Sequence, residues 1–141
     1  MSSSLASLTQ WVDQVAQHTQ ADQVVWCDGS AAENQSLIEN MLASGELVGL
    51  NTKTHPNCYL HRSDPNDVAR VEHLTFVCTE QQADAGPNNH WMDPAKAHAL
   101  MDELFAGAMA GRTLYVVPYC MGPIDSPMAR LGVETGEIGR A

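Results

Sequence analysis

Apolar side chains recur at helical spacing in three segments of the chain, which predicts three amphipathic helices. The first lies near the N-terminus, behind a run of serines. The second begins with the capping box SAAE at residues 30–33 and ends at Gly45. The third begins at Asp93, which a proline follows, and ends at Gly107 or Gly111. The apolar positions that define these helices are Leu5, Leu8, Val12 and Val15; Leu37, Ile38, Met41 and Leu42; and Ala97, Leu100, Met101, Leu104 and Phe105.

Short runs of β-branched, aromatic and other apolar residues predict four strands. QVVWCD (23–28) and RTLYVVPY (112–119) are apolar enough to be buried, and NCYLHR (57–62) and LTFVCTE (74–80) are more mixed. No repeat, low-complexity block or linker separates these elements into two units. The pattern predicts an α/β domain with a mixed sheet and flanking helices.

Composition and charge limit the kinds of molecule that the chain is expected to bind. The 141 residues have the length of one domain, and 17 Asp and Glu against 7 Lys and Arg give a net charge of −10. This charge argues against nucleic acid or an anionic membrane surface as a partner. No apolar run approaches the roughly 20 residues of a membrane span, and the N-terminus lacks the pattern of a signal peptide. Four widely spaced cysteines without a CxxC pair then indicate reduced thiols in a cytoplasmic protein.

Spacing alone identifies no complete catalytic, metal or nucleotide site. The six histidines show no ligand pattern, alone or combined with the cysteines. GAMAGRT (107–113) lacks the spacing of a phosphate-binding loop, and its glycines fall where a helix should end. Asp102 and Glu103 are adjacent on a predicted helix and so point in different directions. Cys120 has no obvious activating base nearby in the sequence.

One segment, SDPNDVARVE (63–72), allows two interpretations of its arginine. If residues 65–71 form a short helix, Asp67 and Arg70 are three residues apart and pair on its surface. Alternatively, Arg70 directs its guanidinium into a cleft and binds a carboxylate or phosphate with two hydrogen bonds. Glu72 would then orient Arg70 or contact a mobile element. The residue pattern leaves both interpretations open.

Several longer blocks resemble GTP-dependent phosphoenolpyruvate carboxykinase. They are CDGS followed by a helix, SDPNDVARVE, TFVCTEQQADAGPNNHWMDP and GRTLYVVPYCMGP, in the same order as in that family. The resemblance extends from about the first helix to Glu134 and implies the fold of the N-terminal lobe. After Glu134 the sequence TGEIGRA departs from the family pattern. We therefore expect a carboxykinase N-terminal-like domain over residues 1–134 and a divergent tail over 135–141.

The resemblance also implies an activity and two site residues. The family consists of cytosolic lyases that convert oxaloacetate and GTP into phosphoenolpyruvate, GDP and carbon dioxide in gluconeogenesis, with Mn²⁺ and Mg²⁺. By this resemblance Arg70 contacts oxaloacetate or phosphoenolpyruvate, and Glu72 is associated with closure of the active-site lid. The family's metal ligands, phosphate loop and guanine site follow the part represented in these 141 residues. We therefore expect no metal or nucleotide site here, no cofactor bound by this chain alone, and no catalysis by the chain alone.

A second hypothesis is a free-standing, non-catalytic α/β module that binds a protein partner or a small dicarboxylate. Under the first hypothesis the lobe should expose apolar surface that it normally packs against the rest of the enzyme. The sequence thus predicts either self-association through that surface or a loosely packed state in solution.

Overall fold

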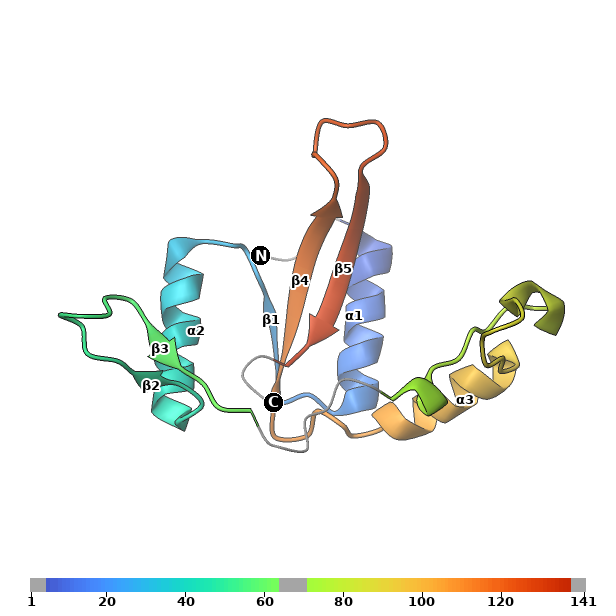
Figure 1. Cartoon of the computed structure of the whole chain (residues 1–141), viewed down its shortest axis with the longest axis horizontal. Coiled ribbons are helices and arrows are strands. Elements are labelled where there is room, and N and C mark those ends of the chain that lie inside the picture. The colour runs from blue at the N-terminus through green and yellow to red at the C-terminus, as the bar shows by residue number, and fades with distance from the viewer. Residues whose placement is uncertain (1–4, 64–70, 138–141) are drawn as a thin grey trace.

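A computed structural model describes residues 5–63 and 71–137 of the chain (Figure 1). All three predicted helices form, at close to the predicted boundaries. The elements follow in the order α1 (Ala6–Thr19), β1 (Gln23–Trp26), α2 (Ala31–Ser44), β2 (Val48–Gly49), β3 (Tyr59–Leu60), the 3₁₀-helices η1 (Glu72–Leu74) and η2 (Gln82–Ala85), α3 (Pro94–Phe105), β4 (Thr113–Met121) and β5 (Arg130–Gly136).

The main sheet has the strand order β1-β4-β5 and is mixed, as predicted. β1 runs parallel to β4, with Gln23 opposite Thr113, whereas β4 and β5 form an antiparallel hairpin. A parallel pair requires a long crossover, and the segment from α2 to α3 supplies it. β2 and β3 form a separate two-stranded sheet that lies outside α2 (Figure 1). The domain is thus α/β with flanking helices, as the sequence indicated.

The helices α1 and α2 cover opposite faces of the main sheet. Leu114 and Val116 of β4 are buried together with Val12 of α1. Because side chains alternate along a strand, Tyr115 points to the other face, where it lines a hollow with Leu37 of α2. Figure 1 shows the sheet between these two helices, with α3 beyond the end of α1.

Two predicted helix ends are confirmed by their geometry. Gly45 follows α2 with φ 85°, the left-handed conformation that glycine adopts without a steric penalty. Asp93 caps α3, and its side chain accepts a hydrogen bond of 3.1 Å from the backbone N–H of Lys96. Gly107 and Gly111 also have positive φ, but α3 already ends at Phe105.

The predicted strand over residues 74–80 is wrong. Leu74 closes the 3₁₀-helix η1, and Val77 makes a single isolated bridge with Trp91. This segment has high β-propensity but finds only one residue of a neighbouring segment to pair with, and propensity without a partner strand does not produce a ladder. The predicted strand over residues 57–62 shortens to Tyr59 and Leu60 for the same reason.

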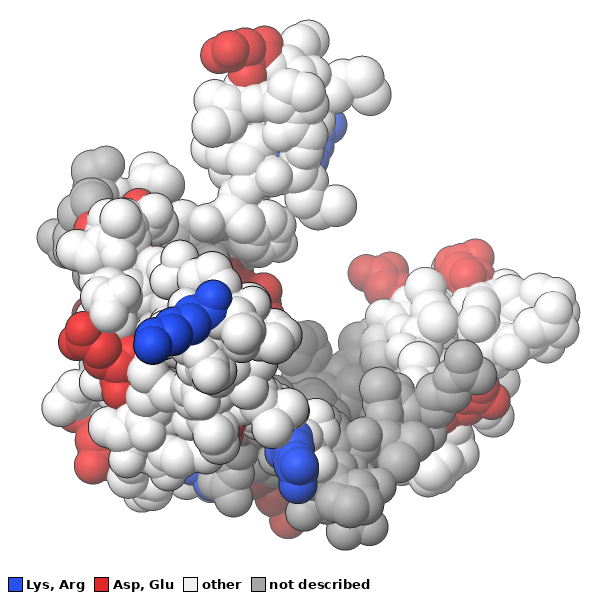
Figure 2. Space-filling view, turned by 60° about the vertical axis from the view of Figure 1, so that its left-hand side comes forward, with Lys and Arg blue, Asp and Glu red and all other residues white. Residues whose placement is uncertain are grey.

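Many large apolar side chains remain exposed. Figure 2 shows a face on which uncharged residues dominate and from which the hairpin of β4 and β5 projects. Leu131 on β5 is 83% exposed and Leu104 on α3 is 61% exposed. This exposure agrees with the apolar surface that the sequence predicted. Across residues 5–63 and 71–137, the structure contains no helix with the length and apolar character needed to span a membrane.

Candidate functional site

Of the two predicted site residues, the structure describes Glu72. It begins the 3₁₀-helix η1, and its carbonyl accepts a hydrogen bond of 3.1 Å from the backbone N–H of Thr75. The side chain of Thr75 also donates to the carbonyl of Val71, which fixes this turn. Arg70 lies outside the described residues. So does the rest of the helix predicted over residues 65–71, except for residue 71. Glu72 is therefore placed, and its relation to Arg70 stays a prediction.

Glu72 borders a polar depression of about 330 Å³, which we call the Glu72 hollow. A second segment, Asn88 to His90, forms its other wall. The two walls meet because the backbone N–H of Val77 donates to the carbonyl of His90 at 2.8 Å. The residues that line the hollow are Glu72, Thr75, Asn88, Asn89 and His90.

Local contacts hold the second wall in place. The side-chain amide of Asn89 donates to the carbonyl of Ala85 at 2.7 Å. The ring of His90 lies 6.1 Å from that of Phe76, tilted by 58°. Trp91, the next residue, donates its indole N–H to the carbonyl of Thr79 at 2.9 Å. The loop is thus tied to residues 76–79, and its polar tip is presented to solvent.

The Glu72 hollow has the chemistry of a hydrogen-bonding site for a polar molecule. Its described lining offers two amides, a hydroxyl, an imidazole and one carboxylate, and it contains no Lys or Arg among the described residues. A carboxylate or phosphate ligand would need a cation from outside this lining. Sequence reasoning did not single out Thr75, Asn88, Asn89 or His90 as site residues, although all four lie in one of the blocks that carry the family resemblance.

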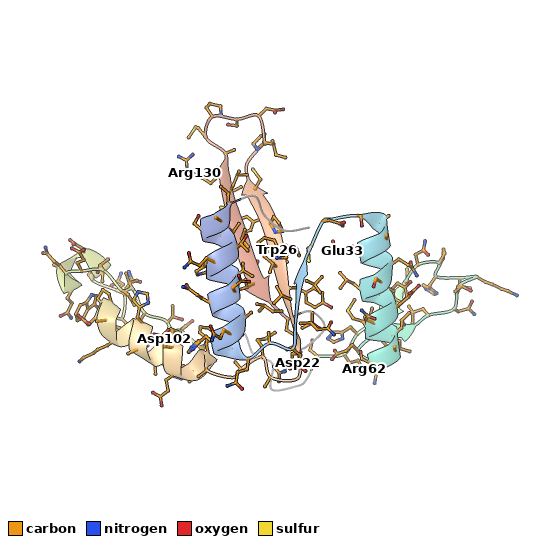
Figure 3. All side chains as sticks on the ribbon, turned by 180° about the vertical axis from the view of Figure 1, so that it is seen from behind. Asp22, Trp26, Glu33, Arg62, Asp102 and Arg130 are labelled. Carbon is orange, nitrogen blue, oxygen red and sulfur yellow. The ribbon has the colours of Figure 1, made fainter. Side chains whose placement is uncertain are left out.

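A second polar cluster joins β1 to α2. Ser30 caps α2 by accepting a hydrogen bond of 3.1 Å from the backbone N–H of Glu33, as the capping box predicted. The Glu33 carboxylate reaches past Ser30 and accepts from the backbone N–H groups of Asp28 and Gly29, the latter at 2.8 Å. Figure 3 shows Glu33 at the end of α2 nearest the turn from β1.

This cluster shifts two pKa values in opposite directions. The backbone N–H of Ser30 donates to Asp28 at 2.8 Å and lowers the pKa of that carboxyl. Partial burial raises the pKa of the Cys27 thiol, and the nearby negative charges of Glu33 and Asp28 raise it further. Cys27 is therefore a protonated thiol with little nucleophilic character. All four cysteines are free.

The other candidates have structural contacts. The carbonyl of Asp102 lies 2.7 Å from Nε2 of His18, a contact that joins α3 to α1 (Figure 3). The backbone N–H of Gly111 donates to Asp22, so the glycine segment after α3 belongs to a turn. Cys120 donates to the carbonyl of Gly122. Over the described ranges, no three His, Cys, Asp or Glu side chains come together as metal ligands.

Comparison with known proteins assigns the family. Residues 10–138 match the phosphoenolpyruvate carboxykinase N-terminal domain family. The chain is 49% identical over 124 residues to the phosphoenolpyruvate carboxykinase [GTP] of Anaeromyxobacter dehalogenans strain 2CP-C, an alignment that covers 88% of the chain and 21% of that protein. It is 48% identical over 129 residues to the protein of the same name from Chlamydia muridarum, across 92% of the chain and 22% of that protein.

The chain thus spans about a fifth of the length of these relatives. The matched region includes every helix and strand described above except the first turn of α1. Because the chain is nearly half identical to each of these relatives over about nine-tenths of its length, it shares the fold of their matching part. The chain therefore belongs to the phosphoenolpyruvate carboxykinase N-terminal domain family.

Proposed function

We propose that this chain supplies the N-terminal part of a cytoplasmic, GTP-dependent carboxykinase that converts oxaloacetate and GTP into phosphoenolpyruvate, GDP and carbon dioxide. The observation that carries the proposal is the identity of 48–49% to carboxykinases over 88–92% of the chain. The contribution of this part is to bind the substrate. Arg70 contacts its carboxylate or phosphate, and Glu72 takes part in closing the site.

The chemistry around Glu72 supports this role for Arg70. Oxaloacetate and phosphoenolpyruvate are anions, whereas the chain has a net charge of −10 and the described lining of the Glu72 hollow holds a carboxylate. A local guanidinium with two parallel donors can bind such an anion against this negative charge. Arg70 is two residues from Glu72 in the sequence and carries such a group. The amides of Asn88 and Asn89 would add neutral hydrogen bonds to the bound substrate.

The described residues do not fit the metal ions of the family, because no three potential ligands among them converge. We therefore assign no step of the reaction to a metal held by this part. One arginine and a polar hollow bind and orient a substrate but do not transfer a phosphoryl group. The chain alone accordingly binds weakly and does not complete the reaction.

The test is an activity assay of the purified chain with oxaloacetate, GTP and Mn²⁺, with the Anaeromyxobacter dehalogenans enzyme as positive control. We expect phosphoenolpyruvate from the control and none from the chain. Turnover by the chain, abolished by Arg70→Ala, would contradict the assignment of this part to substrate binding alone.

The second candidate function is a free-standing module that binds a dicarboxylate, in which the amides of the Glu72 hollow would donate hydrogen bonds and Arg70 would supply the cation that the described lining lacks. Calorimetric titration of the chain with oxalate compares wild type with Arg70→Ala and with the matched control Arg62→Ala. Tight binding that only Arg70→Ala removes would support this module. The proposed role in a larger enzyme instead predicts weak binding that needs the rest of the site.

A further inference from the structure

Thr75 joins two segments of the Glu72 hollow that are fixed in different ways. It follows directly after the 3₁₀-helix η1, in which Glu72 is the first residue, and it lines the hollow. Its backbone N–H donates to the carbonyl of Glu72 at 3.1 Å, which closes this short helix. On its other side the chain continues to Val77, where the second wall begins to hold it. The position of Thr75 therefore helps to set that of Glu72.

The segment that follows is anchored to the second wall by both backbone and side-chain hydrogen bonds. The backbone N–H of Val77 donates to the carbonyl of His90 at 2.8 Å, and the N–H of Met92 donates to the carbonyl of Val77 at 3.3 Å. The indole N–H of Trp91 donates to the carbonyl of Thr79 at 2.9 Å. These bonds give the turn at the start of the hollow a fixed base, even though the strand pairing here is an isolated bridge.

The hydroxyl of Thr75 reaches back to the turn before Glu72. It donates to the carbonyl of Val71 at 3.1 Å, and the backbone N–H of Leu74 donates to the same carbonyl at 2.9 Å. A carbonyl oxygen has two lone pairs and accepts both hydrogen bonds. Val71 has φ −122° and ψ 59°, which are the angles of neither a helix nor a strand. The side-chain hydrogen bond therefore fixes a peptide unit, the one between Val71 and Glu72, that regular secondary structure does not fix.

This hydrogen bond determines what Thr75 can offer to a ligand. A hydroxyl carries one hydrogen, and that of Thr75 is already donated to Val71. Oxaloacetate and phosphoenolpyruvate present ionised carboxylate and phosphate oxygens, which accept hydrogen bonds and do not donate them. While the turn is intact, the hydroxyl therefore has no hydrogen to give to such an anion. Its contribution to binding is indirect, through the backbone that it holds.

We infer that Thr75 is a positioning residue of the substrate site, an inference that rests on the proposed function. Its hydroxyl fixes the peptide unit between Val71 and Glu72 and thereby sets Glu72 at the edge of the hollow, opposite the second wall. Val71 is also the residue that follows Arg70 in the sequence. A turn that is ordered beforehand spares the substrate part of the cost of ordering it on binding. Loss of the hydroxyl should therefore weaken binding while the fold is retained.

The experiment is a titration of the full, isotope-labelled chain with phosphoenolpyruvate, followed by the NMR shifts of its amides. Thr75→Val removes the hydroxyl with little change of shape and should raise Kd about three- to tenfold. Thr75→Ser keeps a hydroxyl and should bind as wild type does. Thr79→Val is the matched control, because the hydroxyl of Thr79 also donates to a backbone carbonyl, that of Gln81 at 2.9 Å, but Thr79 does not line the hollow. Its Kd should equal that of wild type.

A second measurement separates positioning from direct contact. The rate at which amide hydrogens exchange with water reports how well the turn is ordered. In Thr75→Val we expect faster exchange at Leu74 and at residue 75, whose N–H groups donate within the turn, and unchanged exchange at Met92, which donates to Val77. Weaker binding without faster exchange would mean that the hydroxyl contacts the ligand directly, and would overturn the inference.

Arg70→Ala in the same titration tells the two levels of the argument apart. Thr75→Val that binds as wild type does, while Arg70→Ala loses binding, would overturn the role of Thr75 and leave the proposed function standing. Arg70→Ala that binds as wild type does would contradict the proposed function instead. A wild-type chain whose amides do not shift at all would overturn both.

Discussion

The Glu33 carboxylate accepts a hydrogen bond of 2.8 Å from the backbone N–H of Gly29 and thereby ties the first turn of α2 to the end of β1. A capping glutamate usually returns to the N–H of the N-cap residue itself. Here the N–H of Ser30 donates to Asp28 instead, and Glu33 serves the two residues before it. The backbone N–H groups of the turn after β1 thus donate to two carboxylates, Asp28 within the turn and Glu33 in the first turn of α2.

Replacing Glu33 with alanine should destabilise the fold by about 1–2 kcal/mol, because it leaves backbone N–H groups without their partner at a helix N-terminus. Urea unfolding followed by circular dichroism measures this change. Glu39→Ala is the matched control on the same helix, since Glu39 contacts only Gln35 on the surface among the bonds described, and should change stability by less than about 0.5 kcal/mol. Equal effects of the two substitutions would show that the cap at Glu33 is not special.

The thiol of Cys27 should titrate above the ordinary range of cysteine, because burial and the charges of Glu33 and Asp28 raise its pKa. The pH dependence of its alkylation by iodoacetamide, followed by peptide mass spectrometry, gives the midpoint. In Glu33→Gln this midpoint should move to lower pH, because a negative charge is removed. An unchanged midpoint would mean that Glu33 does not act on this thiol.

The lowered pKa of the Asp28 carboxyl predicts that the fold loses stability in acid. Its pKa is lowered in the folded chain, mainly by the backbone hydrogen bond from Ser30. A carboxyl of this kind contributes stability above its unfolded pKa, about 3.9, and loses it as pH falls through the lower folded value. The unfolding free energy should therefore decline less below about pH 4 in Asp28→Asn than in wild type. A carbon-13 titration of the Asp28 carboxyl that falls at or above the ordinary value would refute the shift.

The core between α1 and the sheet should be sensitive to small losses of volume. Val116 is fully buried on the face of β4 that α1 covers, and Val116→Ala should cost about 2 kcal/mol, from lost apolar burial and the remaining cavity. Val117, the next residue, is 36% exposed on the other face. Val117→Ala should cost clearly less in the same thermal or urea unfolding experiment. A larger effect at Val117 would contradict the assignment of the core face.

The features that sequence predicted well depend on residues close together in the chain. The capping box at residues 30–33, the cap at Asp93 and the stop at Gly45 each involve contacts within a few residues. The strand β4 was also recognisable, because its centre is a continuous apolar run, but the predicted burial holds only for Leu114 and Val116. Such signals are encoded locally, and tertiary packing here reinforces them.

The Glu72 hollow could not be predicted in this way. Its two walls are more than ten residues apart, and a single isolated bridge between Val77 and Trp91 brings them together. That bridge also explains the failed strand, since the β-forming run around Val77 meets only one residue of its neighbour. The charged residues of the segment 63–72 made Arg70 and Glu72 candidates for a site. Their roles were suggested by the family resemblance and not by residue chemistry.

The central claim, that this chain provides the substrate-binding N-terminal part of a carboxykinase, is tested most directly by grafting. Residues 10–138 replace the matching segment of the Anaeromyxobacter dehalogenans enzyme, and formation of phosphoenolpyruvate is measured. We expect the graft to be active, Arg70→Ala in the graft to lower kcat/KM about 100-fold, and Arg62→Ala to leave it close to the parent graft. A folded graft without activity, or one in which Arg70→Ala behaves as Arg62→Ala does, would contradict the account.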